Sequence, residues 1–114
     1  MALTAMTACP SQAGPRLAAQ VQCARQGEGL VYVCTIELTD RQTHAPVTGA
    51  TVVVGADMPA MPLAHNVPPV TAVDGGQPGR YRATLRLEMR GRWALRLEVS
   101  GPVKDHLVQV VELL

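Results

Sequence analysis

Two methionines and a histidine stand among prolines in DMPAMPLAHNVPP, residues 57–69. The segment follows the apolar run ATVVVGA and has the composition of a surface loop. An oxidisable apolar side chain gains little from packing in a loop, so Met58, Met61 and His65 indicate either a ligand site or a docking contact. Thioethers are soft neutral donors and imidazole is borderline, a combination that favours Cu(I) over Zn²⁺ or hard oxygen-seeking ions.

The spacing of these methionines sets a condition on the metal hypothesis. If Pro59 occupies the first corner of a type I turn, the Cα atoms of Met58 and Met61 come within about 7 Å, and both sulfur atoms can reach one ion. In an extended polyproline conformation the two side chains stand roughly 9 Å apart, which makes one shared ion harder. Alternatively, Met58 extends the inward face of the preceding strand and belongs to the core.

Most of the chain alternates apolar and polar residues, the pattern of half-buried β-strands. The alternation in LVYVCTIEL, TVVVGADM, RYRATLRLEM and GRWALRLEVSG predicts strands with one apolar face each. No stretch of ten or more residues shows a helical period. Short strands at regular spacing predict an all-β fold, an immunoglobulin-like antiparallel β-sandwich of about seven strands. A small barrel is the alternative, and PPVTAV is compatible with an edge strand.

The order of the strands predicts which residues share an end of this sandwich. Gly91 in EMRGRW resembles the turn of a tight hairpin, and Gly101 with Pro102 closes the next one. If one edge strand follows the methionine-rich loop, Met89 returns to the same end as Met58, as a further ligand or as a cap on the core. His44 and His106 fall at the opposite end and are expected to be ordinary solvated side chains.

Two of the three cysteines are placed to pair. If the chain folds back at Glu28 and Gly29, Cys23 lies directly opposite Cys34. Facing Cα atoms of antiparallel strands are about 4.5 to 5.5 Å apart, within the range of a disulfide. The sequence therefore predicts a Cys23–Cys34 disulfide and an oxidising, periplasmic compartment. Two buried thiols in a reducing cytosol are the alternative.

Composition narrows the classes of partner. Ten Lys and Arg against nine Asp and Glu give a net charge of +1, and aromatic residues make up 3%. A nucleic-acid partner needs a basic field or stacking rings, so none is expected. No run approaches the roughly 20 apolar residues of a membrane-spanning helix.

The first fifteen residues differ from the rest of the chain. MTAC resembles the lipobox of bacterial lipoproteins, which predicts an exported chain that carries a lipid anchor on Cys9. A tolerated N-terminal extension is the alternative. We expect residues 1–15 to lie outside the fold and residues 16–114 to form one domain.

The sequence from about Pro46 to Leu113 resembles the YtkA-like or FixH-like domain of bacterial exported proteins. The resemblance rests on MPAM with the following histidine, on the strand that begins at Gly79, Arg80 and Tyr81, and on the motif Met89, Gly91, Trp93. It implies an immunoglobulin-like sandwich associated with copper handling, cytochrome oxidase assembly or metal efflux. It also implies Met58, Met61, His65 and Met89 as copper ligands, with Trp93 packing under the site.

Two functions follow as hypotheses. The first is a periplasmic Cu(I)-binding protein, a chaperone, resistance factor or oxidase-assembly accessory that passes copper to a copper-handling or efflux partner. The second is a metal-free interaction module that docks to a membrane or efflux complex through Met58, Met61, Leu63 and Val67. An enzyme is not expected, because the sequence contains no nucleophile elbow, phosphate loop or HExxH motif.

Overall fold

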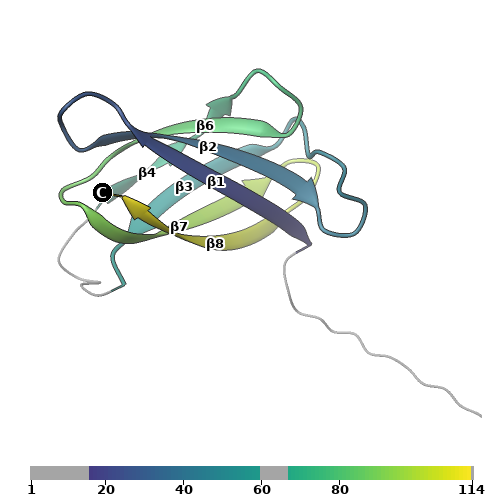
Figure 1. Ribbon diagram of the computed structural model, residues 1–114. Coiled ribbons are helices and arrows are strands. Elements are labelled where there is room, and N and C mark those ends of the chain that lie inside the picture. Colours follow the sequence, from purple (N-terminus) through teal and green to yellow (C-terminus); the bar gives the residue numbers. More distant parts are fainter. Residues whose placement is uncertain (1–15, 60–66, 114) are drawn as a thin grey trace, which may run out of the picture.

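The computed structural model describes residues 16–59 and 67–113, which form two four-stranded antiparallel sheets packed face to face (Figure 1). The first sheet has the strand order β1-β2-β6-β5 and the second sheet the order β4-β3-β7-β8. In chain order the strands are β1 (Leu17–Arg25), β2 (Val31–Asp40), β3 (Thr51–Asp57), β4 (Val67–Thr71), β5 (Val73–Asp74), β6 (Arg80–Arg86), β7 (Gly91–Ser100) and β8 (Asp105–Leu113).

This strand order confirms the predicted immunoglobulin-like sandwich. In the constant-type immunoglobulin fold, strands A, B, E and D form one sheet and C, F and G form the other. The order seen here is the same, with β4 added beside β3. The described chain has eight strands rather than about seven, because Val73 and Asp74 form a short strand of their own. The described strands form two separate hydrogen-bonded sheets, so the fold is a sandwich rather than a barrel.

The core lies between the sheets and follows from the alternation in the sequence. Along β2 the side chains of Tyr32, Cys34, Ile36 and Leu38 are buried, and their neighbours are half-exposed. Strand β7 repeats the pattern, with Trp93 at its start. All buried residues within the described ranges are apolar or aromatic, and none is charged. Burial of one face of each sheet is therefore what holds the two layers together.

The β1–β2 hairpin has the predicted register. Arg25 pairs with Tyr32 and Cys23 with Cys34, so the chain reverses around Glu28. Cys23 and Cys34 form a disulfide with an S–S distance of 2.01 Å. The structure confirms the predicted disulfide, and it contains no pair of free thiols at these two positions.

Strands β4 and β5 are two parts of one edge segment that changes sheet. Pro68 and Pro69 lie in β4, at the edge of the second sheet, where a residue without an N–H is tolerated. At the end of β4 the backbone amide of Ala72 donates to the carbonyl of Val52 over 2.8 Å, and β5 then pairs with β6 in the first sheet. The predicted edge strand is confirmed.

The prediction of a tight hairpin at Gly91 is wrong. Strand β6 pairs with β2 and β5, whereas β7 pairs with β3 and β8, so Leu87–Arg90 carries the chain from one sheet to the other. Gly91 has a φ of 139°, a conformation that glycine adopts without a steric penalty. A glycine with a positive φ can occur where the chain crosses from one sheet to the other, as well as in a hairpin within one sheet. The next connection, at Gly101, is the hairpin that the sequence predicts.

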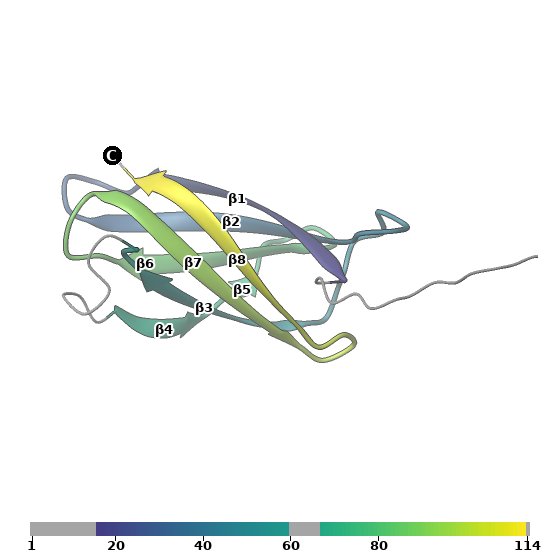
Figure 2. The same ribbon diagram turned by 90° about the horizontal axis from the view of Figure 1, so that it is seen from below.

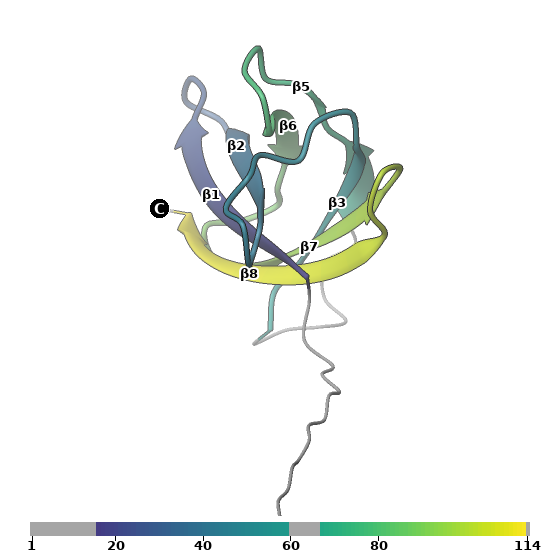
Figure 3. The same cartoon turned by 90° about the vertical axis from the view of Figure 1, so that its right-hand side faces the viewer.

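On one side of the sandwich, β1 and β8 run close together (Figure 3). The Gln109 side chain donates from Nε2 to the carbonyl of Ala19 over 2.8 Å. The Asp105 carboxylate accepts hydrogen bonds from the backbone amides of Arg16 and Leu17 at 2.7 and 2.9 Å. These contacts cover the edges of both strands, which protects them from pairing with other chains. Within residues 16–59 and 67–113, no helix is long and apolar enough to cross a bilayer.

A methionine end and a polar end

The predicted metal ligands that the structure describes lie at one end of the sandwich, here called the methionine end. It comprises the end of β3 with Met58, the β1–β2 turn and the Leu87–Arg90 connection. These segments share the left-hand side of Figure 1 and are seen from below in Figure 2. Two pairings fix the arrangement: Asp57 pairs with Ala94 near the start of β7, and the amide of Leu87 donates to the carbonyl of Leu30 over 2.9 Å.

Met58 closes the core at this end. It is 7% exposed and continues the inward face of β3, as the sequence allows. Its Cε methyl lies 3.0 Å from the position that a Cβ on residue 91 would occupy. Glycine at this position therefore leaves the space that Met58 fills. The sequence marks Gly91 as a turn residue and as part of the Met89, Gly91, Trp93 motif, but it gives no sign of this contact.

Met89 reaches the same end from the opposite sheet. It is partly buried and packs against the core cluster that contains Met58. Its carbonyl oxygen accepts a hydrogen bond from Nε1 of Trp93 over 3.2 Å, and Trp93 is fully buried. Trp93 thus fixes the backbone of the Met89 connection from below. The structure brings Met58 and Met89 to one end from segments far apart in the chain.

Met61, His65 and Cys9 lie outside the described residues. The proposed turn at Pro59 lies partly outside them, since it would end at Met61. The described residues that flank the segment are placed. Pro59, which follows Met58, directly precedes residues 60–66, and Val67, which directly follows them, pairs with Ala56. The segment that carries Met61 and His65 therefore begins and ends beside β3 at the methionine end.

The opposite end of the sandwich, here called the polar end, comprises the β2–β3 connection, the β7–β8 hairpin and the start of β1. His44 lies in the β2–β3 connection and has a φ of 65°. Its backbone amide donates to the carbonyl of Asp40 over 2.8 Å. His106 is exposed, and its Nδ1 lies 2.6 Å from a carboxylate oxygen of Glu98. Both histidines lie far from Met58, as the sequence predicts.

Within the part of the chain that the structure describes, the fold lowers the pKa of the Asp40 carboxyl. Its Oδ1 accepts hydrogen bonds from the backbone amides of Gln42 and Thr43 at 2.8 and 3.0 Å. The bond from Thr43, then that from Gln42, stabilises the carboxylate and lowers the pKa of Asp40 from its usual 3.8. The carboxylate thus holds the turn that leads out of β2.

Within the described residues, no three side chains of the types His, Cys, Asp and Glu lie close enough together to hold one metal ion. The methionine end instead gathers thioethers over a buried indole. Thioethers are ligands for soft metal ions and do not lose ligand strength on protonation. The same two side chains are also apolar and pack in or against the core cluster, which is a common structural role of methionine.

A disulfide-bonded immunoglobulin-like sandwich with methionines gathered at one end is the class of protein that the fold and this end define. Within that class the chain belongs to the YtkA-like family, whose model matches residues 25–98, well over half of the 114 residues. The match covers Met58, Met89, Gly91 and Trp93 and confirms the YtkA-like resemblance. No curated protein and no solved structure matches the chain.

Proposed function

We propose that the protein binds Cu(I) outside the cytoplasm through Met58, Met61, His65 and Met89 and delivers it to a copper-handling or efflux partner. The main support is that Met58, which lies against Gly91, and Met89, which packs against the same core cluster, share the methionine end. The segment with Met61 and His65 begins and ends at the same place. Copper is the cargo in this proposal rather than a resident cofactor.

The ligand chemistry suits transfer. Two or three soft donors hold Cu(I) and leave a position open for a donor of the partner, so the ion passes by ligand exchange. Burial of a thioether in the core costs little free energy, because the group is neutral and apolar. Burial of a carboxylate would cost much more. Met58, which is 7% exposed, can therefore remain packed without the ion and turn about its three rotatable bonds to bind it.

The disulfide supports the proposed location outside the cytoplasm. Cross-strand disulfides such as Cys23–Cys34 persist in oxidising environments and are rare in the cytosol of mesophiles. Thiolate ligands would oxidise in the same place, whereas thioethers and imidazole remain competent for copper. Location in the periplasm, with a lipid on Cys9 as the anchor, completes the proposal.

The burial of Met58 also supports a second function. Met58 belongs to the core cluster and Met89 packs against it, as expected if both are structural. Met61, Leu63 and Val67 would then form the contact surface of a metal-free interaction module. Catalysis is not part of either proposal, because a redox-active copper site needs stronger nitrogen donors than one histidine supplies.

The test is an anaerobic titration of Cu(I) against a chromophoric competitor. We expect one equivalent to bind to the unaltered protein, and binding to weaken at least about tenfold in each of Met61→Ala, His65→Ala and Met89→Leu. Met58→Leu belongs to the same series because a swap of similar volume keeps the core filled and costs under about 1.5 kcal/mol.

The matched controls are His44→Ala and His106→Ala, which remove an imidazole from the polar end. They should leave Cu(I) binding unchanged. No competition with the chelator by the unaltered protein would contradict the copper proposal and favour the interaction module. Equal losses in the controls and in His65→Ala would show that the bound copper is not at the methionine end.

A further inference from the structure

The outer face of the second sheet carries apolar side chains that the fold does not use. Along β8, Leu107 and Leu113 point inward, and Val108 and Val110 point outward with 53% and 57% of their surface exposed. On the same face, Val108 pairs with Arg96 and Val110 with Ala94. The outer face of the first sheet differs, since its described outward residues on β1 and β6 are mostly glutamine, threonine and arginine.

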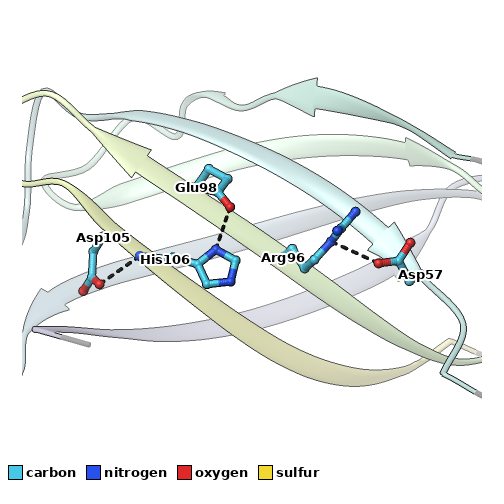
Figure 4. Close-up of polar contacts among 5 residues, drawn as sticks. All are labelled: Asp57, Arg96, Glu98, Asp105 and His106. Carbon is cyan, nitrogen blue, oxygen red and sulfur yellow. Dashed lines mark hydrogen bonds and ion pairs between the residues drawn. The ribbon is translucent and has the colours of Figure 1, made fainter. Parts of the chain in front are cut away.

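Arg96 does not cover these valines. Its Nε lies 3.0 Å from Oδ2 of Asp57, and its Nη2 lies 3.2 Å from where a Cβ on Gly55 would be. The guanidinium therefore lies across β3, away from β8 (Figure 4). Without a side chain at Gly55, Arg96 has room to lie there, and Val108 is left open.

Besides Arg96 and Asp57, this face carries two charged pairs that join β7 to β8. Arg92 Nε lies 3.0 Å from a carboxylate oxygen of Glu112, and these residues are cross-strand partners near one end of β7 and β8. Glu98 and His106 are cross-strand partners near the other end and are joined over 2.6 Å (Figure 4). On β7 the first pair contributes the cation, Arg92, and the second pair the anion, Glu98. The order of charge across the two strands therefore reverses from one end of the face to the other.

The row formed by Leu95 and its partner Gln109 lies midway between the two pairs. Arg92 and Glu98 stand at equal distances along β7 on either side of Leu95. His106 and Glu112 do the same on β8 on either side of Gln109. Val108 and Val110 are the immediate neighbours of Gln109.

We propose that this face binds a second copy of the chain, with a two-fold axis running along the Leu95–Gln109 row. Rotation about that axis places Val108 of one copy on Val110 of the other. It also places Arg92 opposite Glu98 and His106 opposite Glu112 of the second copy. Along β8 valine thus meets valine, and along β7 the Arg92 guanidinium meets the Glu98 carboxylate, which is the self-complementarity that a two-fold interface requires. The His106 imidazole adds an opposite charge to Glu112 when it is protonated, and Ala94 lies opposite Arg96, whose guanidinium is held over β3 by Asp57.

This arrangement runs the strands of the two copies in opposite directions. The methionine end of one copy then lies beside the polar end of the other, so the two methionine ends point to opposite poles of the dimer. The dimer covers neither end, and the proposal does not depend on copper binding. A shared edge-strand interface is not involved, because β4 carries prolines and β8 is covered by β1.

The test uses two charge-swapped variants that keep the ion pairs within each chain. The first is Arg92→Glu with Glu112→Arg, and the second is Glu98→Arg with His106→Glu. In the second variant alone, the two-fold axis brings like charges together in both contacts. In the first variant alone, it sets two carboxylates against each other at Arg92→Glu and Glu98, and it removes the carboxylate that faces His106. We expect the unaltered protein to dimerise as its concentration rises and each variant to associate at least about tenfold more weakly, measured by sedimentation velocity.

An equimolar mixture of the two variants is the decisive measurement. The carboxylate that Arg92→Glu introduces in the first variant then faces the guanidinium that Glu98→Arg introduces in the second. The other contacts are likewise complementary, so the mixture should recover the dimer. Unchanged thermal unfolding would show that the variants are folded. A monomeric unaltered protein, variants that dimerise as well as it does, or a mixture that stays monomeric would each overturn the proposal and leave the face to solvent or to a different partner.

Discussion

The two ends of the sandwich are closed by different interactions. At the polar end, carboxylates hold backbone amides: Asp105 binds those of Arg16 and Leu17, and Asp40 binds those of Gln42 and Thr43. At the methionine end, the side chains that close the core are apolar, with Met58 against Gly91 above the fully buried Trp93.

This difference separates stability from ligand binding. Directional hydrogen bonds fix one arrangement of a turn, whereas unbranched thioethers tolerate several arrangements at little cost. The polar end is therefore expected to tie down the chain where it enters the fold. The methionine end is expected to change shape around an ion or a partner. Substitutions of similar severity at the two ends should have different effects on Cu(I) binding.

The largest expected effect is at Trp93. Its replacement by alanine removes the largest fully buried side chain and the hydrogen bond to the Met89 carbonyl. Loss of such a side chain typically costs about 3–5 kcal/mol in the free energy of unfolding. Urea denaturation followed by far-UV circular dichroism measures this cost. Trp93→Phe, which keeps most of the volume, should weaken Cu(I) binding in a protein that still folds.

A loss of stability for Trp93→Ala below about 1 kcal/mol would contradict the assignment of Trp93 as the base of the methionine end. Unchanged copper affinity in Trp93→Phe would show that the Met89 backbone needs no support from the indole.

Tyr81 is the counterpart at the polar end. Its hydroxyl donates to the carbonyl of Val47 over 2.7 Å and accepts from the amide of Ala50 over 3.1 Å. Tyr81→Phe leaves both backbone groups without this partner, which should cost about 1–3 kcal/mol in the free energy of unfolding. Copper affinity, measured in the same competition assay, should not change. A matching loss of copper affinity would mean that the two ends are coupled through the core.

Two glycines allow a matched comparison of the ends. Gly91 has a φ of 139° and Gly101 a φ of 112°. A Cβ at position 91 would lie 3.0 Å from Met58 Cε, and one at position 101 would lie 3.3 Å from the Gly49 carbonyl oxygen. Each Gly→Ala change should destabilise the fold by about 1–3 kcal/mol.

Only Gly91→Ala should also weaken Cu(I) binding, because it displaces Met58. Thermal unfolding and the chelator competition, run on both variants, separate the two effects. Equal copper affinities in Gly91→Ala and Gly101→Ala would remove Met58 from the ligand set.

The strands and the disulfide could be predicted because both follow from local periodicity. The alternation in β2 and β6 sets which side chains face inward, and the fold-back at Glu28 then sets Cys23 opposite Cys34. The connection at Gly91 does not follow from periodicity. Inward faces look alike in both sheets, so the sequence does not show whether a connection reverses within a sheet or crosses to the other.

The contact between Met58 and Gly91 could not be predicted either. It depends on how β3 and β7 align and on the crossing of Leu87–Arg90 between the sheets. Strand β8 presents a different ambiguity. Val108, Val110 and Val111 offer an apolar residue to either face, and only the packing shows that Val108 and Val110 point outward. Met61 and His65 stay predictions from residue type and spacing.

The smallest expected effect concerns the pH dependence of the polar end. Hydrogen bonds from the amides of Thr43 and Gln42 lower the pKa of Asp40 in the folded state, so folding favours its ionised form. The stability that Asp40 contributes is fully present above the unfolded pKa, near 3.8, and is lost as the pH falls through the lower folded pKa. Asp40→Asn should therefore lower the melting temperature slightly at neutral pH, and the two proteins should converge in acid.

A melting-temperature difference that stays constant from neutral to acidic pH would show that the carboxylate acts through shape rather than charge. The methionine end provides the contrast, because thioethers do not titrate, whereas an imidazole binds a metal ion only in its neutral form. Under the copper proposal, Cu(I) affinity should fall as the pH is lowered, and this fall should be absent in His65→Ala but retained in Asp40→Asn. Low pH would thus lower the stability of the fold through Asp40 at the polar end, and the affinity for Cu(I) through His65 at the methionine end.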